Sequence, residues 1–150
     1  MRRGQDGFTL AEMLVVLAIL ALTAVLSFPA SRQSAEGQVF NTFGQSLAGL
    51  LREARITAIS QNHETSVTLD FETRTAAGAG KSRVLAIPAN VSVAAITARG
   101  DVSEGRATFR FFADGGATGG EIKLRNGKTV RLIAINWLTG AITMHAGDAL

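Results

Sequence analysis

Residues 8–28 form an almost unbroken apolar run, interrupted by one carboxylate, Glu12, and preceded by Arg2 and Arg3. As an α-helix, these roughly 21 residues would span about 31 Å, close to the hydrocarbon thickness of a bilayer. The two arginines favour a cytoplasmic N-terminus. A secretory signal places its small-residue cleavage site after the apolar stretch, whereas the best small-residue break here, Gly7-Phe8, precedes it. Cleavage at that bond would leave the hydrophobic helix on the mature protein as an anchor.

Glu12 is the unusual residue in this run. A charged side chain well inside a bilayer costs about 2.5–3.5 kcal/mol on insertion scales. In a simple signal anchor, Glu12 would be an interfacial residue near the cytoplasmic end. Alternatively, it pairs with a cation supplied by another subunit. If Phe8 became the mature N-terminus, its amine would be such a cation, one helical turn away at the same depth. Opposite charges attract strongly in a low dielectric, although desolvation cancels much of the gain.

The segment Gly7-Phe8-Thr9-Leu10-Ala11-Glu12, followed by Met13 to Leu17, resembles the leader of type IV pilins and type II secretion pseudopilins. The resemblance implies that residues 1–7 are a leader, which an inner-membrane prepilin peptidase removes by cutting between Gly7 and Phe8. The same enzyme would then methylate the new N-terminal Phe8. Glu12 would be the assembly carboxylate that brings the subunit into register with its neighbour. The outermost tip subunit of the family typically lacks this carboxylate, so a subunit that keeps it is expected beneath another one.

Composition limits the remainder of the chain. Its 150 residues leave room for one domain beyond the anchor, with an adequate core. The absence of cysteine excludes a disulfide framework and a thiolate metal site. A net charge of +3 is too small to imply nucleic acid by itself.

Residues 30–62 are predicted to form an amphipathic helix. Pro29 lacks the N–H that would bond to the Val25 carbonyl, so a kink is expected there. Beyond it, apolar residues recur at spacings of three and four, which predicts a stripe lying on a sheet. These residues are Val39, Phe43, Leu47, Leu50, Leu51, Ala54 and Ala58.

From His63 onward the apolar period switches to two, which predicts strands. Val67 and Leu69 mark the first strand, and Thr73–Ser82, rich in Ala and Gly, is expected to be a loop. Further strands are expected at Arg83–Ile87, Val91–Ile96 and Arg106–Phe112. In the last of these, Phe109 and Phe111 would share one face.

A hairpin around Asn126-Gly127 is the clearest β signal. Placing Leu124 opposite Val130, and Ile122 opposite Leu132, requires a three-residue loop or a bulge. The following segment, Val130–Trp137, is apolar on both faces and is expected to be a central strand covered on both sides, on one of them by the helix.

Three C-terminal motifs narrow the resemblance: Phe111–Gly115, Thr118–Ile122 and Asn136–Gly140. They are similar to the family of minor pseudopilin H of type II secretion and its minor-pilin relatives. The resemblance implies an α+β fold, with a long N-terminal helix packed on antiparallel sheets arranged as a β-sandwich. The expected regions are the leader 1–7, the transmembrane and assembly half of the helix 8–29, its amphipathic half 30–62, and a periplasmic β domain 63–150.

This resemblance also carries the functional expectation. The protein would be a minor pseudopilin, single-pass in the bacterial inner membrane, near the tip of a periplasmic pseudopilus that helps to export folded proteins. Its partners would be other pseudopilins, the prepilin peptidase and the inner membrane. The alternative is a minor type IV pilin involved in pilus assembly or DNA uptake.

Enzymatic and cofactor sites are not expected. His63 and His145 stand alone, while zinc usually takes several such ligands. A calcium loop presents several spaced oxygens, but only Asp114 and Glu121 are charged in the glycine-rich region. Gly78–Ser82 lacks the leading glycine of a phosphate loop and lies between strands. We therefore expect no metal, no cofactor and no catalytic residue.

A basic surface is the rival functional feature. Lys123, Arg125 and Arg131 are expected on the outward face of the last hairpin, with Lys128 in its loop. Such a patch could contact DNA phosphates. An ordinary solvated sheet face is the more common explanation, so nucleic acid is an unlikely partner.

Overall fold

The computed structural model describes residues 9–26, 35–79, 83–97, 102–103 and 105–147. The chain divides into two compact units, Met1–Ala35 and Glu36–Leu150. The first contains helix α1, Leu10–Leu26. Among the described residues, no helix combines the length and the apolar character needed to cross a membrane. The kink expected at Pro29 lies outside the described residues.

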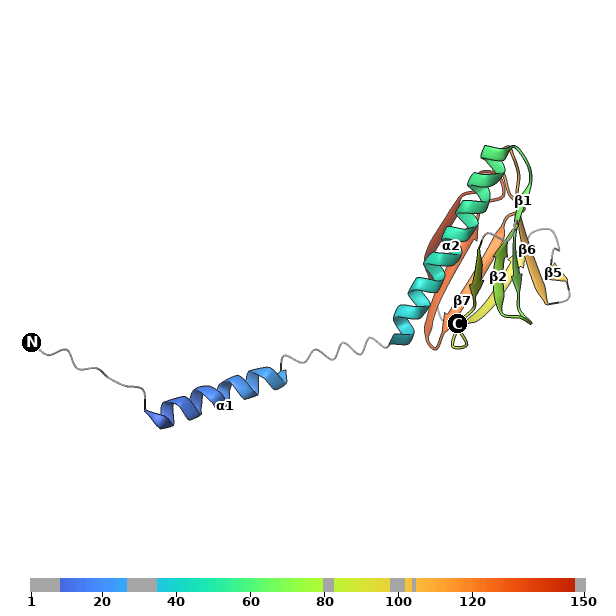
Figure 1. The fold of residues 1–150 in the computed structure, drawn as a ribbon. Helices are drawn as coiled ribbons and strands as arrows, with labels where there is room; N and C mark the ends of the chain where they lie inside the picture. The colour runs from blue at the N-terminus through green and yellow to red at the C-terminus, as the bar shows by residue number, and fades with distance from the viewer. Residues whose placement is uncertain (1–8, 27–34, 80–82, 98–101, 104, 148–150) are drawn as a thin grey trace, which may run out of the picture. The chain divides into compact units, whose positions relative to one another are not determined.

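In the described residues from Ala35 onward, α2, Ala35–Gln61, is followed by nine short strands that form two antiparallel sheets (Figure 1). The five-stranded sheet has the order β3-β2-β1-β6-β5, and the four-stranded sheet has the order β4-β7-β8-β9. The strand bounds are β1 Thr65–Asp70, β2 Thr75–Gly78, β3 Val84–Ala86, β4 Ser92–Thr97, β5 Val102–Ser103, β6 Arg106–Phe111, β7 Gly120–Asn126, β8 Thr129–Ile135 and β9 Ile142–Gly147. The expected α+β class, a helix packed on antiparallel sheets, is confirmed.

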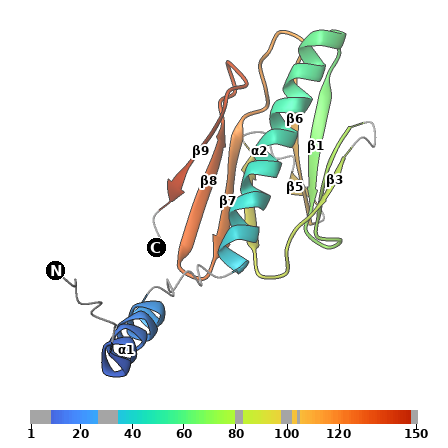
Figure 2. The same cartoon turned by 60° about the vertical axis from the view of Figure 1, so that its left-hand side comes forward.

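Helix α2 packs against both sheets, with β7, β8 and β9 along one side and β1 and β3 along the other (Figure 2). The helix contacts both sides: Leu50 lies near Gly78 of β2, and Gly44 lies near Leu124 and Met144 of the other sheet. The buried residues of the helix are Phe40, Phe43, Gly44, Leu47, Ala48, Leu50, Leu51, Ala54 and Ala58.

Most of the predicted stripe is therefore correct, but its N-terminal end is not. Val39 is 46% exposed, while Phe40 is 1% exposed and belongs to the core. A single stripe describes a helix on one sheet. Because α2 contacts two sheets, its buried face is broader and is centred differently near its start.

The end of α2 is determined by local hydrogen bonds. Asn62 adopts a left-handed conformation with φ 51°, and the His63 N–H donates to the Ala58 carbonyl at 3.2 Å. This geometry is typical of a Schellman C-cap. The Thr65 hydroxyl, at the start of β1, donates to the Ala54 carbonyl at 2.7 Å and attaches the first strand to the helix.

Burial alternates along β1 and β6, as the period of two predicts. Val67 and Leu69 are buried, and Phe109 and Phe111 share their face of the sheet. The prediction of a loop over Thr73–Ser82 is wrong, because β2 occupies Thr75–Gly78. Its inward residues are both small: Ala76, which is buried, and Gly78, which lies near Leu50 of α2. A strand built from Ala and Gly lacks the alternation of large apolar residues, so its sequence resembles that of a loop.

The register predicted for the last hairpin is also wrong. Arg125 pairs with Val130, Leu124 pairs with Arg131, and Asn126 and Thr129 flank a two-residue turn at Gly127-Lys128. A shift of one residue moves every side chain of a strand to the opposite face. Gly127 has φ +56°, so it supplies the left-handed position that a two-residue hairpin turn needs. The interior position predicted for β8, between β7 and β9, is confirmed.

Candidate functional site

The N-terminal motif places Glu12 in the first turn of α1. The Glu12 N–H donates to the Thr9 carbonyl at 3.0 Å and lies 3.3 Å from Thr9 Oγ1, so Thr9 caps the helix. A carboxylate in a first turn is favoured by the helix dipole. The predicted cleavage and methylation residues, Gly7 and Phe8, lie outside the described residues.

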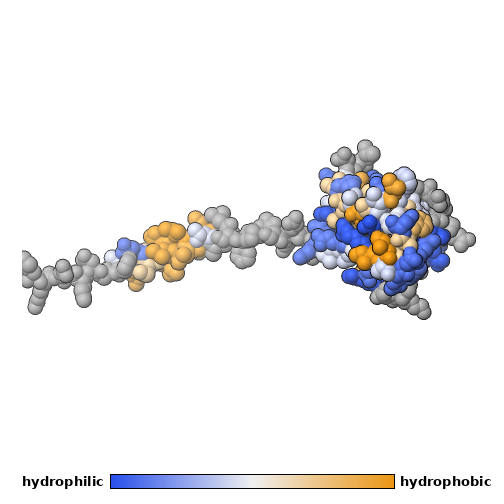
Figure 3. All heavy atoms as spheres, turned by 90° about the horizontal axis from the view of Figure 1, so that it is seen from above, coloured by the Kyte–Doolittle hydropathy of each residue, from blue (hydrophilic) through white to orange (hydrophobic). Residues whose placement is uncertain are grey.

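The apolar side chains of α1 are spread around the helix rather than along one stripe. Figure 3 shows hydrophobic atoms on the face of α1 turned to the viewer. Leu10, Leu14, Leu17, Leu20 and Leu22 are between 58% and 80% exposed. Thr23 turns its hydroxyl back to the carbonyls of Ile19 and Leu20, both at 3.0 Å, so its polar group is satisfied within the helix. Helices that are hydrophobic all round are buried in large cores or in lipid. Glu12 is the one carboxylate within this helix.

The basic surface predicted on the last hairpin is only partly present. Lys123 and Arg125 lie on the outward face of β7, whereas Arg131 pairs with Leu124 and lies on the helix-facing side. Its aliphatic chain comes within about 4.0 Å of the position that a Cβ on Gly44 would occupy. Lys128 is exposed in the turn. The three cations therefore do not share one face.

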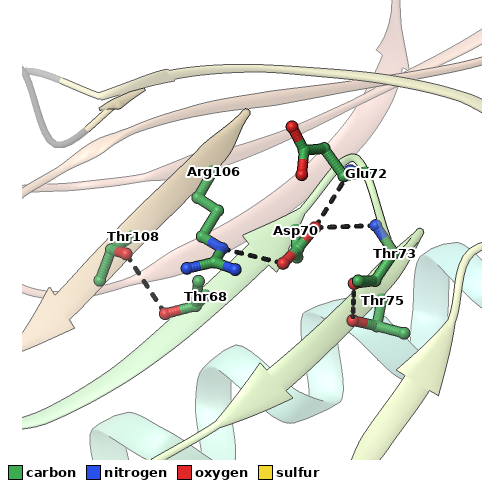
Figure 4. A network of polar contacts seen from close by, with 7 residues as sticks. All are labelled: Thr68, Asp70, Glu72, Thr73, Thr75, Arg106 and Thr108. Carbon is green, nitrogen blue, oxygen red and sulfur yellow. Dashed lines mark hydrogen bonds and ion pairs between the residues drawn. The ribbon is translucent and has the colours of Figure 1, made fainter. Parts of the chain in front are cut away.

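A polar network on the outer face of the five-stranded sheet holds the β1–β2 turn (Figure 4). Asp70 Oδ1 accepts hydrogen bonds from the N–H groups of Glu72 at 3.0 Å and Thr73 at 2.8 Å. Its Oδ2 accepts one from Arg106 Nε at 2.8 Å. The Thr73 N–H, followed by the Arg106 guanidinium, lowers the pKa of Asp70 from 3.8 to about 2. These contacts fasten a turn and are fully accounted for by the fold.

We call the end of the globular unit at which α2 terminates its polar end, meaning its position at one pole of the unit. This end carries the turn Asn136–Gly140, which we call the polar-end turn. Asn136 Oδ1 accepts hydrogen bonds from the N–H groups of Leu138 and Thr139, both at 3.0 Å. The Gly140 N–H donates to the Asn136 carbonyl at 2.8 Å, and Gly140 has φ +61°. An Asx-type turn closed by a left-handed glycine is a rigid local structure.

A second loop, Phe112–Gly119, packs against this turn. The Ala117 N–H donates to the Trp137 carbonyl at 2.9 Å, and Asp114 Oδ1 accepts from the Gly116 N–H at 2.9 Å. Arg55 of α2 donates through Nε to the Gly115 carbonyl at 3.3 Å. Helix and both loops are thus joined at one end of the unit.

The two loops enclose an open pocket of about 380 Å³, lined by Phe112, Asp114, Gly116, Ala117, Thr118, Trp137 and Leu138. Trp137 and Leu138 are each 66% exposed beside it. Ile59, 46% exposed at the end of α2, lies next to Gly115. The prediction that the strand continues to Trp137 is wrong, because β8 ends at Ile135 and Trp137 belongs to the turn.

The residues considered for metal or phosphate chemistry are not brought together. His63 is exposed after α2, and His145 is exposed in β9 opposite Leu132. Asp114 is in the loop beside the pocket, and Glu121 is in β7. In the described part of the chain, no group of three or more His, Asp or Glu residues could hold a metal ion. Of Gly78–Ser82, only Gly78 and Ala79 are described, and Gly78 is in β2.

Comparison with known protein families identifies the chain. Residues 44–140 match the family described as type II transport protein GspH. The chain belongs to that family. Residues 2–28 match the prokaryotic N-terminal methylation motif, which contains the predicted cleavage motif and Glu12. The resemblance found at both ends of the sequence is therefore confirmed, and so is the predicted role as a minor pseudopilin.

Similar individual proteins agree with this assignment. The chain is 31% identical over 142 residues to type II secretion system protein H of Xanthomonas campestris pv. campestris, covering 94% of this chain and 83% of that protein. Its fold is similar to the type IV minor pilin FimU of Pseudomonas aeruginosa, with a TM-score of 0.59, 15% identity, and coverage of 76% and 96% of the two chains. It is also similar to the minor pseudopilin EpsH of Vibrio cholerae, with a TM-score of 0.54, 12% identity, and coverage of 68% and 92%.

Sequence reasoning did not anticipate the exposed Trp137 and Leu138 beside the pocket. The sequence predicts a turn at Leu138–Gly140, but it places Trp137, in the same motif, at the end of a strand. Neither the exposure of Trp137 nor its position beside Asp114 follows from spacing, because the loop that brings them together is about 20 residues away along the chain. Arg55 likewise reads as an ordinary charge on the solvated side of a helix.

Proposed function

We propose that this GspH-family protein is a minor pseudopilin that is inserted in the bacterial inner membrane by residues 8–29, with its β domain, residues 63–150, in the periplasm. Prepilin peptidase removes residues 1–7 by cutting between Gly7 and Phe8, and methylates Phe8. The mature subunit assembles with other pseudopilins near the tip of a short pseudopilus that helps to export folded proteins. The subunit is structural and catalyses no reaction.

The observation that carries this proposal is the combination of an apolar helix bearing one acid with a GspH-type globular unit. Helix α1 exposes apolar side chains on all sides and has Glu12 in its first turn. Such a surface needs lipid or neighbouring helices to cover it. The globular unit matches the family over residues 44–140. We also propose that the two sheets, whose buried faces contribute to one core with α2, form the β-sandwich implied by the resemblance.

The proposed role of Glu12 is to pair with the Phe8 amine of a neighbouring subunit. Both groups would lie at the same depth in an apolar environment, where an unpaired charge is strongly unfavourable and a paired one is tolerated. The pair would therefore select one axial register between adjacent helices. Because Glu12 needs the amine of a neighbour, we propose that another subunit lies above this one in the filament.

Substitution of Glu12 tests this role. Glu12→Ala and Glu12→Gln are expected to be cleaved normally but to be incorporated poorly into the pseudopilus, because neither carries the negative charge. Glu36→Ala is the matched control, since Glu36 is the corresponding first-turn acid of α2. Cleavage is followed by N-terminal sequencing, and incorporation by immunoblotting of sheared filaments. Normal incorporation of Glu12→Gln would contradict the pairing role.

The cleavage site has its own test. Gly7→Ala is expected to be processed, whereas a bulky residue at position 7 should leave the precursor intact, because the peptidase needs a small residue before the bond that it cuts. Mass spectrometry of the mature protein should find an N-terminal methylated Phe8. An N-terminus downstream of Ala30 on a released, soluble molecule would exclude the anchored pseudopilin.

The alternative of a minor type IV pilin in pilus assembly or DNA uptake loses part of its basis. It relied on three cations on one sheet face, and Arg131 is on the opposite face from Lys123 and Arg125. Salt-dependent binding of duplex DNA by the protein would favour the alternative.

A further inference from the structure

The polar-end surface exposes more apolar side chain than the fold requires. We define it as Ile59, Phe112, Asp114, Trp137 and Leu138. Trp137 and Leu138 are consecutive and each 66% exposed, although both are large and apolar. Seen from the end at which α2 terminates, the globular unit shows hydrophobic and hydrophilic groups of atoms side by side (Figure 3). Contiguous apolar patches of this kind mark interaction sites.

This surface is rigidly constructed. The backbone of Trp137 is fixed by its hydrogen bond to Ala117, and Gly119 lies directly beneath it: a Cβ on Gly119 would come within 2.8 Å of Trp137 Cβ. The Asn136 side chain and Gly140 fix the other side of the turn. Arg55 joins both loops to α2. A turn whose backbone is already fixed loses little conformational entropy on binding, which favours Trp137 as an interface anchor.

The charge of the surface indicates what covers it. Asp114 is the one charged residue that lines the pocket. Its Oδ1 is used by the Gly116 N–H, while within the described part of the chain its Oδ2 accepts no hydrogen bond. A complementary partner therefore brings a cation to Asp114 and an apolar side chain to the space beside Trp137 and Leu138.

We propose that the polar-end surface is the docking site for the globular domain of a different, neighbouring pilin-like subunit, which inserts an aliphatic side chain beside Trp137 and places a Lys or Arg against Asp114. This inference rests on the proposed function. In a filament, a subunit that retains Glu12 has another subunit above it, and the end at which α2 terminates is the end of the globular unit opposite to the one where the chain enters. The polar-end surface would therefore contact the globular domain of the subunit above.

Site-specific photocrosslinking in intact cells tests the proposal. The full-length chain carries a photoreactive phenylalanine derivative in place of Leu138, and is expressed in cells that lack the wild-type gene. The expected product is an adduct with another subunit carrying a prepilin leader, identified by mass spectrometry of the crosslinked peptide. The matched control places the same group at Ile96, which is 71% exposed on β4 and outside this surface. No such adduct is expected there.

Substitutions at two positions, Trp137 and Asp114, test the contacts individually. Adding Trp137→Ala should lower the adduct yield roughly tenfold or more, as for truncation of an aromatic anchor at an interface. Asp114→Lys should lower it strongly, while Asp114→Asn, which can still accept the Gly116 N–H, should have an intermediate effect. The cellular level and protease resistance of each full-length variant show that it is folded.

The outcomes separate this inference from the proposed function. The docking site would be overturned by an adduct with a second copy of this chain or with lipid. It would also be overturned by an equal adduct yield at Ile96 or by the absence of any adduct. Secretion of folded proteins restored by the wild-type gene would leave the proposed function intact in each of those cases. If the wild-type gene does not restore secretion, the proposed function itself fails.

Discussion

Single residues at the polar end can be tested through their backbone conformation. Gly140 has φ +61°, and a Cβ there would overlap the Gly115 carbonyl oxygen and the Arg55 side chain. Gly140→Ala is therefore expected to cost about 2–4 kcal/mol, which combines a left-handed alanine with a backbone clash. Gly127→Ala is the control, because Gly127 has φ +56° but no atom within 4 Å of the added Cβ. It should cost only about 1 kcal/mol. Chemical denaturation measures both, and equal losses would contradict the close packing around Gly140.

Asp70 is the single residue from which we predict a pH dependence of stability. Its pKa is lowered to about 2 by the Thr73 N–H and the Arg106 guanidinium, against 3.8 for an ordinary aspartate. A group whose pKa is lowered on folding stabilises the protein above the unfolded pKa, and this contribution is lost as the pH falls. The loss should occur between about pH 4 and pH 2. Asp70→Asn should lower Tm above pH 5, and the difference from wild type should shrink toward pH 2. A Tm difference that is constant over this range would contradict the assignment.

At the scale of elements, Gly44 and Gly49 of α2 differ in how closely other elements approach them. A Cβ on Gly44 would lie 3.5 Å from Leu124 Cδ1 and 3.6 Å from Met144 Sδ, which is ordinary contact, and one on Gly49 would meet nothing within 4 Å. Both Gly→Ala changes should stabilise the helix by about 0.5–1 kcal/mol. Gly44→Leu should instead destabilise it by about 1–3 kcal/mol through overpacking, whereas Gly49→Leu should not. Denaturation midpoints compare the four variants. Equal effects of leucine at both positions would exclude the close contact with β7 and β9.

The same scale shows where sequence patterns are informative. Alternation predicted β1 and β6 because each has one buried and one solvated face. It did not predict β2, because the inward residues of that strand, Ala76 and Gly78, are too small to give an apolar alternation. It also did not predict the register of β7 and β8. Both faces of β8 carry apolar residues, so the pattern cannot distinguish one register from the neighbouring one.

For the whole molecule, the two compact units predict independent folding of the globular part. Every buried apolar residue of the described core lies at Phe40 or later. A fragment containing residues 36–150 should therefore unfold cooperatively, with a Tm within a few degrees of the full-length chain in detergent. A fragment starting at Ala48 should not fold, because it lacks Phe40, Phe43 and Leu47, which are 1%, 6% and 0% exposed. Circular dichroism melting curves test both, and failure of the longer fragment would show that the N-terminal unit contributes to the fold.

The sequence by itself determined the features that are local or periodic. The apolar run with its single acid, the amphipathic segment that becomes α2, the alternation of β1 and β6 and the family resemblance all depend on residues close together in the chain. Tertiary structure decided the centre of the buried face of α2, the strand at Thr75–Gly78, the placement of Arg131 beneath the helix and the exposure of Trp137. Each of these depends on what a distant segment brings to the same place, and no local pattern records the position of that segment.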